Sequence, residues 1–359
     1  MNEKEFQFEK IDIINYLNTV EEYELIKQLD KVTDIATKRC AKVKSGEKVL
    51  ILGDTGSDER IMDLFLYKCR EVGAEALKMS FHFVESVQKI PERVSRAMRE
   101  CDVLFPFTKT AILYSDAIER TLEKGRILFM ANLETHNMLR PVVLEADFEA
   151  MSQIGSIIKS IIQNAKKLQV KTKAGTDAIM YMDSNRPVKC RDSVADKVGE
   201  LDYLPGGSWS AAPIEESVNG IFVVDVSLYP IGLLNEPVIF TYKNGWIENV
   251  EGGKHAKKMK DWLEYRQKIN NGEKMHYFFS HIGGGINKRA SATGNLMEDE
   301  RIWNAFCISG GSNQMVFKGK NNAHSHWDGM CLDCTLIADG VQIIEDGKFV
   351  HPQLAKFEK

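Results

Sequence analysis

The sequence predicts two domains of different fold class: an α/β domain with a doubly wound parallel sheet, followed by an α+β domain built mainly of antiparallel strands. Residues 1–145 alternate short apolar runs with stretches of helical period, which is typical of a parallel sheet covered by helices. Residues 170–359 instead contain short β-rich segments separated by Gly and Asn. Residues 146–169 have helical period and are expected to form a helix that links the two domains.

The elements of the first domain follow from its hydrophobic period. Apolar side chains recur at helical spacing from about Ile11 to Val43, and Gly46 follows as a stop signal. Lys48–Gly53 is a short, continuously apolar run that predicts a buried strand. We expect further strands at 76–83, 102–107 and 126–133, and helices at 59–72, 90–99 and 113–124.

The second domain shows few stretches of helical period after residue 170. The exception is His255–Asn270, which predicts a helix. Asp339-Gly340 and Asp346-Gly347 predict hairpin turns between short strands. We expect β segments at 178–182, 220–225, 238–242, 315–317 and 335–337.

Composition excludes several classes of protein. The 359 residues are 43% hydrophobic and 27% charged, and the formal charge of −4 is spread without a basic stripe, so neither nucleic acid nor an anionic membrane is expected as a partner. Met1–Lys10 is polar, so export is not expected, and the apolar runs are too short to span a bilayer. Seven scattered cysteines are an odd number, which indicates reduced thiols. We therefore expect a cytoplasmic protein.

Polar residues with metal-binding chemistry are concentrated in the second domain. In a strand, residues two apart face the same side, so His324, His326 and Asp328 project together if this stretch is extended. Two imidazoles and a carboxylate on one face form a plausible metal-binding edge. The alternative is a polar strand rim whose histidines only form hydrogen bonds.

His281 strengthens the metal interpretation. It precedes three successive glycines, which allow close approach of the backbone to a ligand. Together with one downstream histidine and Asp328 it would complete a two-histidine, one-carboxylate set, which favours non-haem Fe(II), with Mn(II) or Zn(II) possible. A tight turn with a satisfied histidine remains the alternative.

The second half of the sequence resembles a superfamily that joins thermophile-type metallo-aminopeptidases to the 2,5-dihydroxypyridine 5,6-dioxygenases. The resemblance rests on an ordered series of motifs: Leu204–Ser208, Ala212-Pro213 with Gly220, His281–Asn287, Gly310–Asn313, His326–Asp328, and the Asp339-Gly340 and Asp346-Gly347 turns. The α/β first domain also fits, so the likeness spans most of the chain. It implies a dimer or a larger homo-oligomer.

The departures from the aminopeptidase pattern favour the dioxygenases. Ser208 and His281 stand where the aminopeptidases have Glu, and residues 305–307 lack a further His, so a two-metal site would miss much of its ligand set. The dioxygenases are similar in having a His at position 281 and His-x-Asp at 326–328, with a single iron. By this resemblance the metal ligands are His281, His326 and Asp328, and Tyr114 stands at the position of the dioxygenases' catalytic His.

The sequence thus predicts a mononuclear non-haem Fe(II) ring-cleaving dioxygenase that acts on a hydroxylated N-heteroaromatic or a similar chelating small molecule. A metal-dependent aminopeptidase or amidohydrolase using Zn, Mn or Co is the alternative, and a binding scaffold without catalysis is the third possibility. Besides the ligands, we expect catalytic roles for Tyr114, His324 and Ser208, and substrate-binding roles for Trp209, Gly283, Gly284 and Trp327.

Overall fold

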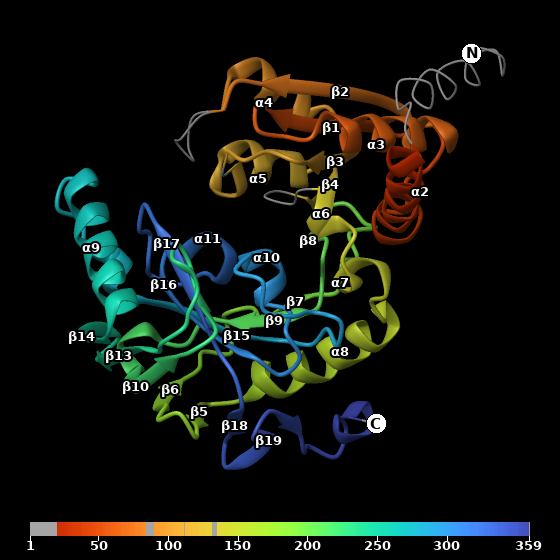
Figure 1. Cartoon of the computed structure of the whole chain (residues 1–359). Helices are drawn as coiled ribbons and strands as arrows, with labels where there is room; N and C mark the ends of the chain where they lie inside the picture. The colour runs from red at the N-terminus through yellow and green to blue at the C-terminus, as the bar shows by residue number, and fades with distance from the viewer. Residues whose placement is uncertain (1–19, 84–89, 111, 131–134, 359) are drawn as a thin grey trace. The chain divides into compact units, whose positions relative to one another are not determined.

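The computed structural model describes residues 20–83, 90–110, 112–130 and 135–358 (Figure 1). The chain divides into two compact units. The first comprises Met1–Leu144 together with Ser193–Pro205, and the second comprises Glu145–Asp192 together with Gly206–Lys359. Among the described residues, no helix combines the length and apolar character needed to cross a membrane.

The first unit contains a five-stranded parallel sheet with the strand order β2-β1-β3-β4-β8. The inner strand β1, which pairs with β2 on one side and β3 on the other, has only one exposed residue. The predicted parallel α/β fold is therefore confirmed. The strands are β1 (Lys48–Asp54), β2 (Glu75–Phe81), β3 (Val103–Pro106), β4 (Arg126–Phe129) and β8 (Leu201–Tyr203), and the main helices are α3 (Glu59–Glu71), α4 (Glu92–Arg99) and α5 (Asp116–Leu122).

The N-terminal helix and the helix predicted at 113–124 differ in detail from expectation. The described part of the N-terminal helix is α2 (Val20–Asp34), which continues as a π-helical turn at Ile35–Cys40, while residues 11–19 of the prediction lie outside the described residues. A short 3-10 turn at Ile112–Tyr114 precedes α5. Two short helices, α6 (Thr135–Met138) and α7 (Pro141–Leu144), complete this part of the unit.

The first unit is not continuous in sequence. Strand β8 adds to β4 at the edge of the parallel sheet, although it lies almost sixty residues beyond the boundary expected at 145. A three-residue strand is too short to show a hydrophobic period, so the sequence gives no sign of this return. The expected linking helix is α8 (Phe148–Asn164), which belongs to the second unit and is followed by strand β5 (Lys167–Thr172).

The second unit contains two antiparallel sheets and two long helices, α8 and α9 (Lys254–Ile269). The eight-stranded sheet has the order β14-β13-β10-β6-β5-β18-β19-β20, and the seven-stranded sheet has the order β12-β11-β17-β16-β15-β9-β7. Its strands beyond β5 are β6 (Asp177–Tyr181), β7 (Lys189–Arg191), β9 (Ser208–Ala211), β10 (Asn219–Val224), β11 (Ser227–Leu228), β12 (Gly232–Leu233), β13 (Val238–Lys243), β14 (Trp246–Gly252), β15 (Phe279–Gly285), β16 (Phe306–Gly311), β17 (His326–Cys331), β18 (Cys334–Ala338), β19 (Val341–Glu345) and β20 (Lys348–Phe349).

One β segment was predicted wrongly. Residues 315–317 form part of a single helical turn, α11 (Gln314–Phe317), in which the backbone N–H of Phe317 donates to the carbonyl of Asn313. The turn ends at Lys318, whose φ of 57° is left-handed. Three apolar residues fit a strand and a helical turn equally well, so their period could not decide between the two.

The two sheets pack face to face, and this buries one face of the seven-stranded sheet. Trp327 of β17 stacks on Phe240 of β13 with the ring centroids 4.8 Å apart, and Phe279 of β15 lies 5.8 Å from Phe222 of β10. We call this buried side of the seven-stranded sheet the core face. The opposite side, which we call the site face, carries the polar residues described next.

Candidate metal centre

His281 reaches the site face through a β-bulge. In the pairing of β15 with β16, Phe279 opposes Gly310 and Ile282 opposes Ile308, so that Ser280 and His281 together oppose Ser309. Such an extra residue changes the direction of the side chains locally. Phe279 and Ile282 can therefore both point to the core face while His281 points to the site face.

His326 and Asp328 come from β17, on the far side of β16. Asp328 pairs with Ser309 and His326 pairs with Gly311. Since directly paired residues of antiparallel strands point to the same side, Ser309, Asp328 and His326 share the site face. Three adjacent strands thus bring together residues that are 47 positions apart in sequence.

The two imidazoles converge on one carboxylate. Nε2 of His281 lies 3.7 Å from Oδ1 of Asp328, and Nε2 of His326 lies 3.4 Å from Oδ2 of the same residue. The two rings are nearly parallel, with centroids 5.2 Å apart, and Phe317 of α11 stacks on the His281 ring at 5.0 Å. The Asp328 side chain is only 4% exposed, so this anion lies in a largely desolvated site.

Ser309 fixes the orientation of His281. Its hydroxyl accepts a hydrogen bond from the backbone N–H of His281 at 3.0 Å and donates to the carbonyl of the same residue, also at 3.0 Å. The hydroxyl also contacts Nδ1 of the ring. Because its single proton is used on the carbonyl, we assign the imidazole proton to Nδ1, which leaves the lone pair of Nε2 facing Asp328.

The charge states follow from burial and from the neighbouring groups. Burial lowers the pKa of His281 to about 4, and the charge of Asp328 opposes this only in part, so His281 is neutral at neutral pH. Burial would also lower the pKa of His326, but the charge and hydrogen bond of Asp328, together with the charge of Glu300 and a backbone hydrogen bond to Ser312, outweigh it and raise that pKa. Burial would raise the pKa of Asp328, but the two histidines lower it, so the carboxylate is anionic.

These residues fit a divalent metal ion. A neutral imidazole lone pair directed at a carboxylate is unfavourable, and a cation between them would satisfy both groups. Nitrogen and oxygen ligands bound at about 2.1 Å and at right angles lie about 3 Å apart. The observed separations of 3.4 and 3.7 Å exceed this by a few tenths of an ångström. Two histidines and one carboxylate suit a non-haem iron site with open positions.

Two further groups that the sequence did not identify lie near this centre. The thiol of Cys307 donates to Oδ1 of Asp328 at 3.6 Å, and the ligand atoms of His281, Cys307 and Asp328 all lie within 4.8 Å of one another. Burial raises the pKa of Cys307 well above its usual value. Burial also raises the pKa of Glu300 to about 7; Arg301 lowers it in part, and the charge of Asp328 adds to the rise. Neither residue belongs to a recognisable local motif.

His324 and Trp327 lie away from the centre. Strand β17 begins only at His326, so the alternation expected from residue 324 does not apply; His324 is exposed, and its carbonyl accepts a hydrogen bond from Arg266. Trp327 points to the core face, where it is fully buried and its Nε1 donates to the carbonyl of His276 at 3.0 Å. Trp327 therefore packs in the core and does not make the substrate contact that was expected of it.

The remaining predicted residues divide between the two faces. Gly284 pairs with Trp209, and both belong to the core face, where the indole of Trp209 covers Gly284. Ser208 and Gly283 belong to the site face, and a Cβ on Gly283 would lie 2.6 Å from the carbonyl oxygen of Trp209, so only glycine fits there. Tyr114 ends a 3-10 turn in the first unit, but its side chain is not among those that the structure describes.

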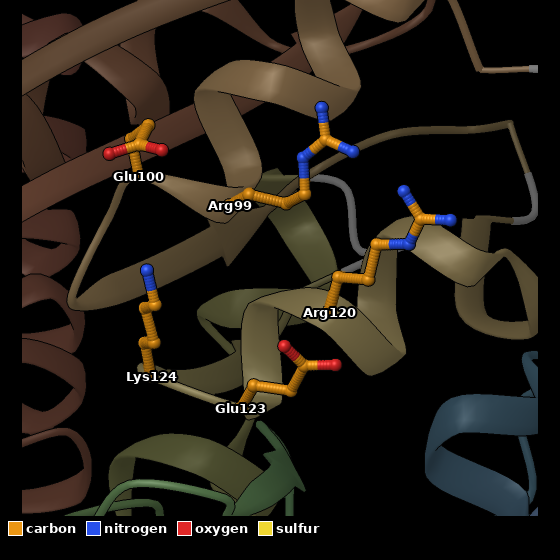
Figure 2. Close-up of a pocket in the computed structure, with 5 residues that line it drawn as sticks. All are labelled: Arg99, Glu100, Arg120, Glu123 and Lys124. Atoms are coloured by element: carbon orange, nitrogen blue, oxygen red, sulfur yellow. The ribbon is translucent and has the colours of Figure 1, made fainter.

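A separate hollow of about 260 Å³ lies in the first unit (Figure 2). Arg99, Glu100, Arg120, Glu123 and Lys124 line it, and Figure 2 shows their charged ends spread around the opening. Because none of its lining residues belongs to the proposed ligand set, we assign this hollow no part in the metal centre.

The fold and the ligand set define a two-unit protein with a candidate mononuclear metal centre of the two-histidine, one-carboxylate type. Residues 35–351 match the family model of the 2,5-dihydroxypyridine 5,6-dioxygenases, and the chain belongs to this family. The resemblance found in the sequence is thereby confirmed.

A sequence relative agrees with this assignment, and two solved structures share the fold. The chain is 26% identical over 254 residues to a 2,5-dihydroxypyridine 5,6-dioxygenase of Pseudomonas putida. The aligned region covers 67% of this chain and 69% of the relative. The structure of 2,5-dihydroxypyridine dioxygenase from the KT2440 strain has a TM-score of 0.78 at 21% identity, covering 91% of this chain and 98% of that one. Wild-type AmpT from Thermus thermophilus has a TM-score of 0.64 at 13% identity, covering 90% and 99%. The two structures support the predicted fold class.

Proposed function

We propose that this chain is a mononuclear non-haem Fe(II) dioxygenase that cleaves the ring of a hydroxylated N-heteroaromatic or a similar chelating substrate. The observation that carries the proposal is the convergence of His281, His326 and Asp328 on one face of a sheet. Membership of the 2,5-dihydroxypyridine 5,6-dioxygenase family supports ring-cleaving oxygen chemistry.

The three residues would hold the metal while leaving coordination positions free for small molecules. Bound Fe(II) would supply the electrons and the open positions that oxygen activation beside a chelated substrate requires. Ser309 keeps the Nε2 lone pair of His281 directed toward the ion, and Phe317 shields one side of that ring. A carboxyl group with a pKa near neutrality, as in Glu300, is suited to hold or release a proton during turnover.

The proposal also includes Ser208 on the site face and Tyr114 in the first unit as residues that handle protons. We further propose a cytoplasmic homo-oligomer. Among the described residues, none of the seven cysteines forms a disulfide, which fits a reducing compartment. Light scattering would measure the oligomer size.

The test uses the full chain, loaded with Fe(II) without oxygen and then mixed with 2,5-dihydroxypyridine and air. We expect oxygen uptake and loss of the ring absorbance. His326→Ala should abolish both and lower the bound iron to well below one equivalent by elemental analysis. His324→Ala is the matched control, because this exposed neighbour lies outside the ligand set, and it should retain iron.

Stoichiometric iron in the His326→Ala protein would contradict the ligand assignment. Hydrolysis of aminoacyl amides without oxygen by the Zn(II)- or Co(II)-loaded protein, with no oxygen uptake by the Fe(II) form, would support the hydrolase alternative instead. A protein that takes up none of these metals would indicate a scaffold without catalysis.

A further inference from the structure

The site face continues beyond the metal centre to the edge strand β7. Ser210 of β9 pairs with Gly283 of β15 on one side and with Lys189 of β7 on the other. Because directly paired residues of antiparallel strands point to the same side, Lys189 faces the same side of the sheet as His281 and Asp328. In the next row, Arg191 pairs with Ser208.

Two small residues lie between Lys189 and the metal centre along this row of the sheet. Gly283 has no side chain and Ser210 has a short, half-buried one. Adjacent strands lie about 4.8 Å apart, so β7 is about 10 Å from β15, and the long side chain of Lys189 can shorten this gap. Along this row of the sheet, only Ser210 and Gly283 lie between Lys189 and β16, the strand that carries Ser309 of the metal centre.

Lys189 is half-buried and surrounded by positive charge. Burial lowers its pKa, and Arg191, Lys159 and Lys318 lower it further. Lys318 directly follows Phe317, the residue that stacks on His281. In the part of the chain that the structure describes, no carboxylate forms an ion pair with Lys189. A cation with other cations close by, and with no ion pair of its own, is a site of positive potential that attracts an anion.

We propose that Lys189 binds a carboxylate substituent of the substrate, at the end of the molecule opposite the oxygen atoms that chelate the metal. This inference rests on the proposed function, because it places the chelating end at His281, His326 and Asp328. It narrows the substrate class to acidic chelators, such as a dihydroxylated pyridine that bears a ring carboxylate. Ser210 and Gly283 would form the surface beneath the ring.

The first test compares two probes that differ only in the carboxylate: 2,3-dihydroxypyridine and 5,6-dihydroxynicotinate. Binding to the Co(II)-loaded protein is measured by calorimetry without oxygen. We expect the wild type to bind the acid about tenfold more tightly, a factor that one charge-assisted hydrogen bond of modest strength supplies. Lys189→Met should abolish this preference without weakening the binding of the neutral probe, and Lys189→Arg should retain part of it.

The matched control is Lys171→Met, which removes an exposed lysine of β5 in the other sheet and should keep the wild-type preference. Equal affinity of the wild type for the two probes would overturn the inference. A full preference in the Lys189→Met protein would overturn it as well.

A second test needs no metal and separates this inference from the proposed function. Nicotinate, which carries the carboxylate but no chelating pair of hydroxyls, should slow the acetylation of Lys189 by acetic anhydride, as followed by peptide mass spectrometry; nicotinamide should not. Equal protection by inorganic phosphate would identify an unspecific anion site and overturn the inference, as would no protection by nicotinate. Protection by nicotinate in a protein that binds neither dihydroxypyridine would retain the carboxylate site and contradict the proposed function.

Discussion

Replacing Ser309 with Ala tests whether the hydroxyl holds His281 ready for a metal. Ser309 is fully buried, and its hydroxyl accepts the backbone N–H of His281, donates to the carbonyl of His281 and contacts Nδ1 of its ring. The substitution removes all three contacts and one oxygen atom, while the strand pairing with Asp328 stays in place. The imidazole then becomes free to change both its rotamer and its tautomer.

Two effects of different size are expected. A buried backbone N–H left without a partner costs about 1–3 kcal/mol in the free energy of unfolding. Removing a group that orients a metal-ligating histidine weakens metal affinity by about 10–100-fold, which is about 1.4–2.8 kcal/mol of binding free energy. Urea unfolding measures the first effect, and titration of Co(II) or anaerobic Fe(II) against a chelator of known affinity measures the second.

Ser227→Ala provides the control, because Ser227 is a buried serine of β11 in the same sheet but is not part of the metal centre. It should leave the metal affinity unchanged. Wild-type metal affinity in the Ser309→Ala protein, with native circular dichroism, would refute the idea that this hydroxyl sets the tautomer of His281. An equal loss in both variants would show that the effect is general to the sheet.

Two further substitutions separate the stability of the second unit from its metal chemistry. Trp327→Ala should lower the free energy of unfolding by about 3–5 kcal/mol, because a fully buried indole leaves the core. The metal affinity should change little. A large loss of metal affinity in the folded variant would show that Trp327 does contribute to the metal centre. Glu215→Gln removes the charge of a fully buried carboxylate that pairs with Arg186 at 2.7 Å, and should cost about 3 kcal/mol at pH 7. Burial would raise the pKa of Glu215, but Arg186 and other donors lower it, so the ion pair stabilises fully above the ordinary pKa of 4.5 and loses its effect as the pH falls through the lowered value. Urea midpoints between pH 7 and 3 should therefore fall more steeply for the wild type than for Glu215→Gln, and parallel curves would contradict this.

Residue chemistry and motif order in the sequence identified the candidate ligand set, but not the contacts that orient it. Alternation in a strand correctly relates His326 to Asp328, and the same rule already places Trp327 on the opposite face. His324 was misjudged because the strand begins two residues later than the polar run suggests. Where a strand starts depends on its partners, here β16, and not on the local pattern alone.

Features that depend on pairing between distant strands could not be predicted. Ser309 directly precedes the Gly310–Asn313 motif, and only its position opposite the bulge at Ser280 and His281 shows its role. Cys307 belongs to no sequence motif, and only its hydrogen bond to Asp328, 21 residues further along, shows that it lies beside the candidate metal centre. Strand β8 pairs with β4, which lies about 75 residues earlier in the sequence. A local hydrophobic period cannot reveal a pairing between such distant segments.

The bulge in β15 explains how one sheet can support both a dense core and a metal centre. Regular alternation would place Phe279 and His281 on the same face, so a strand without the bulge could not bury the phenylalanine and present the histidine to the opposite side. The extra residue resolves this conflict: Phe279 packs against Phe222 in the core, while His281 faces Asp328. It also places two backbone groups of His281 beside the single hydroxyl of Ser309. The bulge thus directs the side chain of His281 toward Asp328, and it also brings the backbone of His281 to the Ser309 hydroxyl that fixes the tautomer of the ring. Substituting the side chain of His281 alone cannot separate these two effects of the bulge.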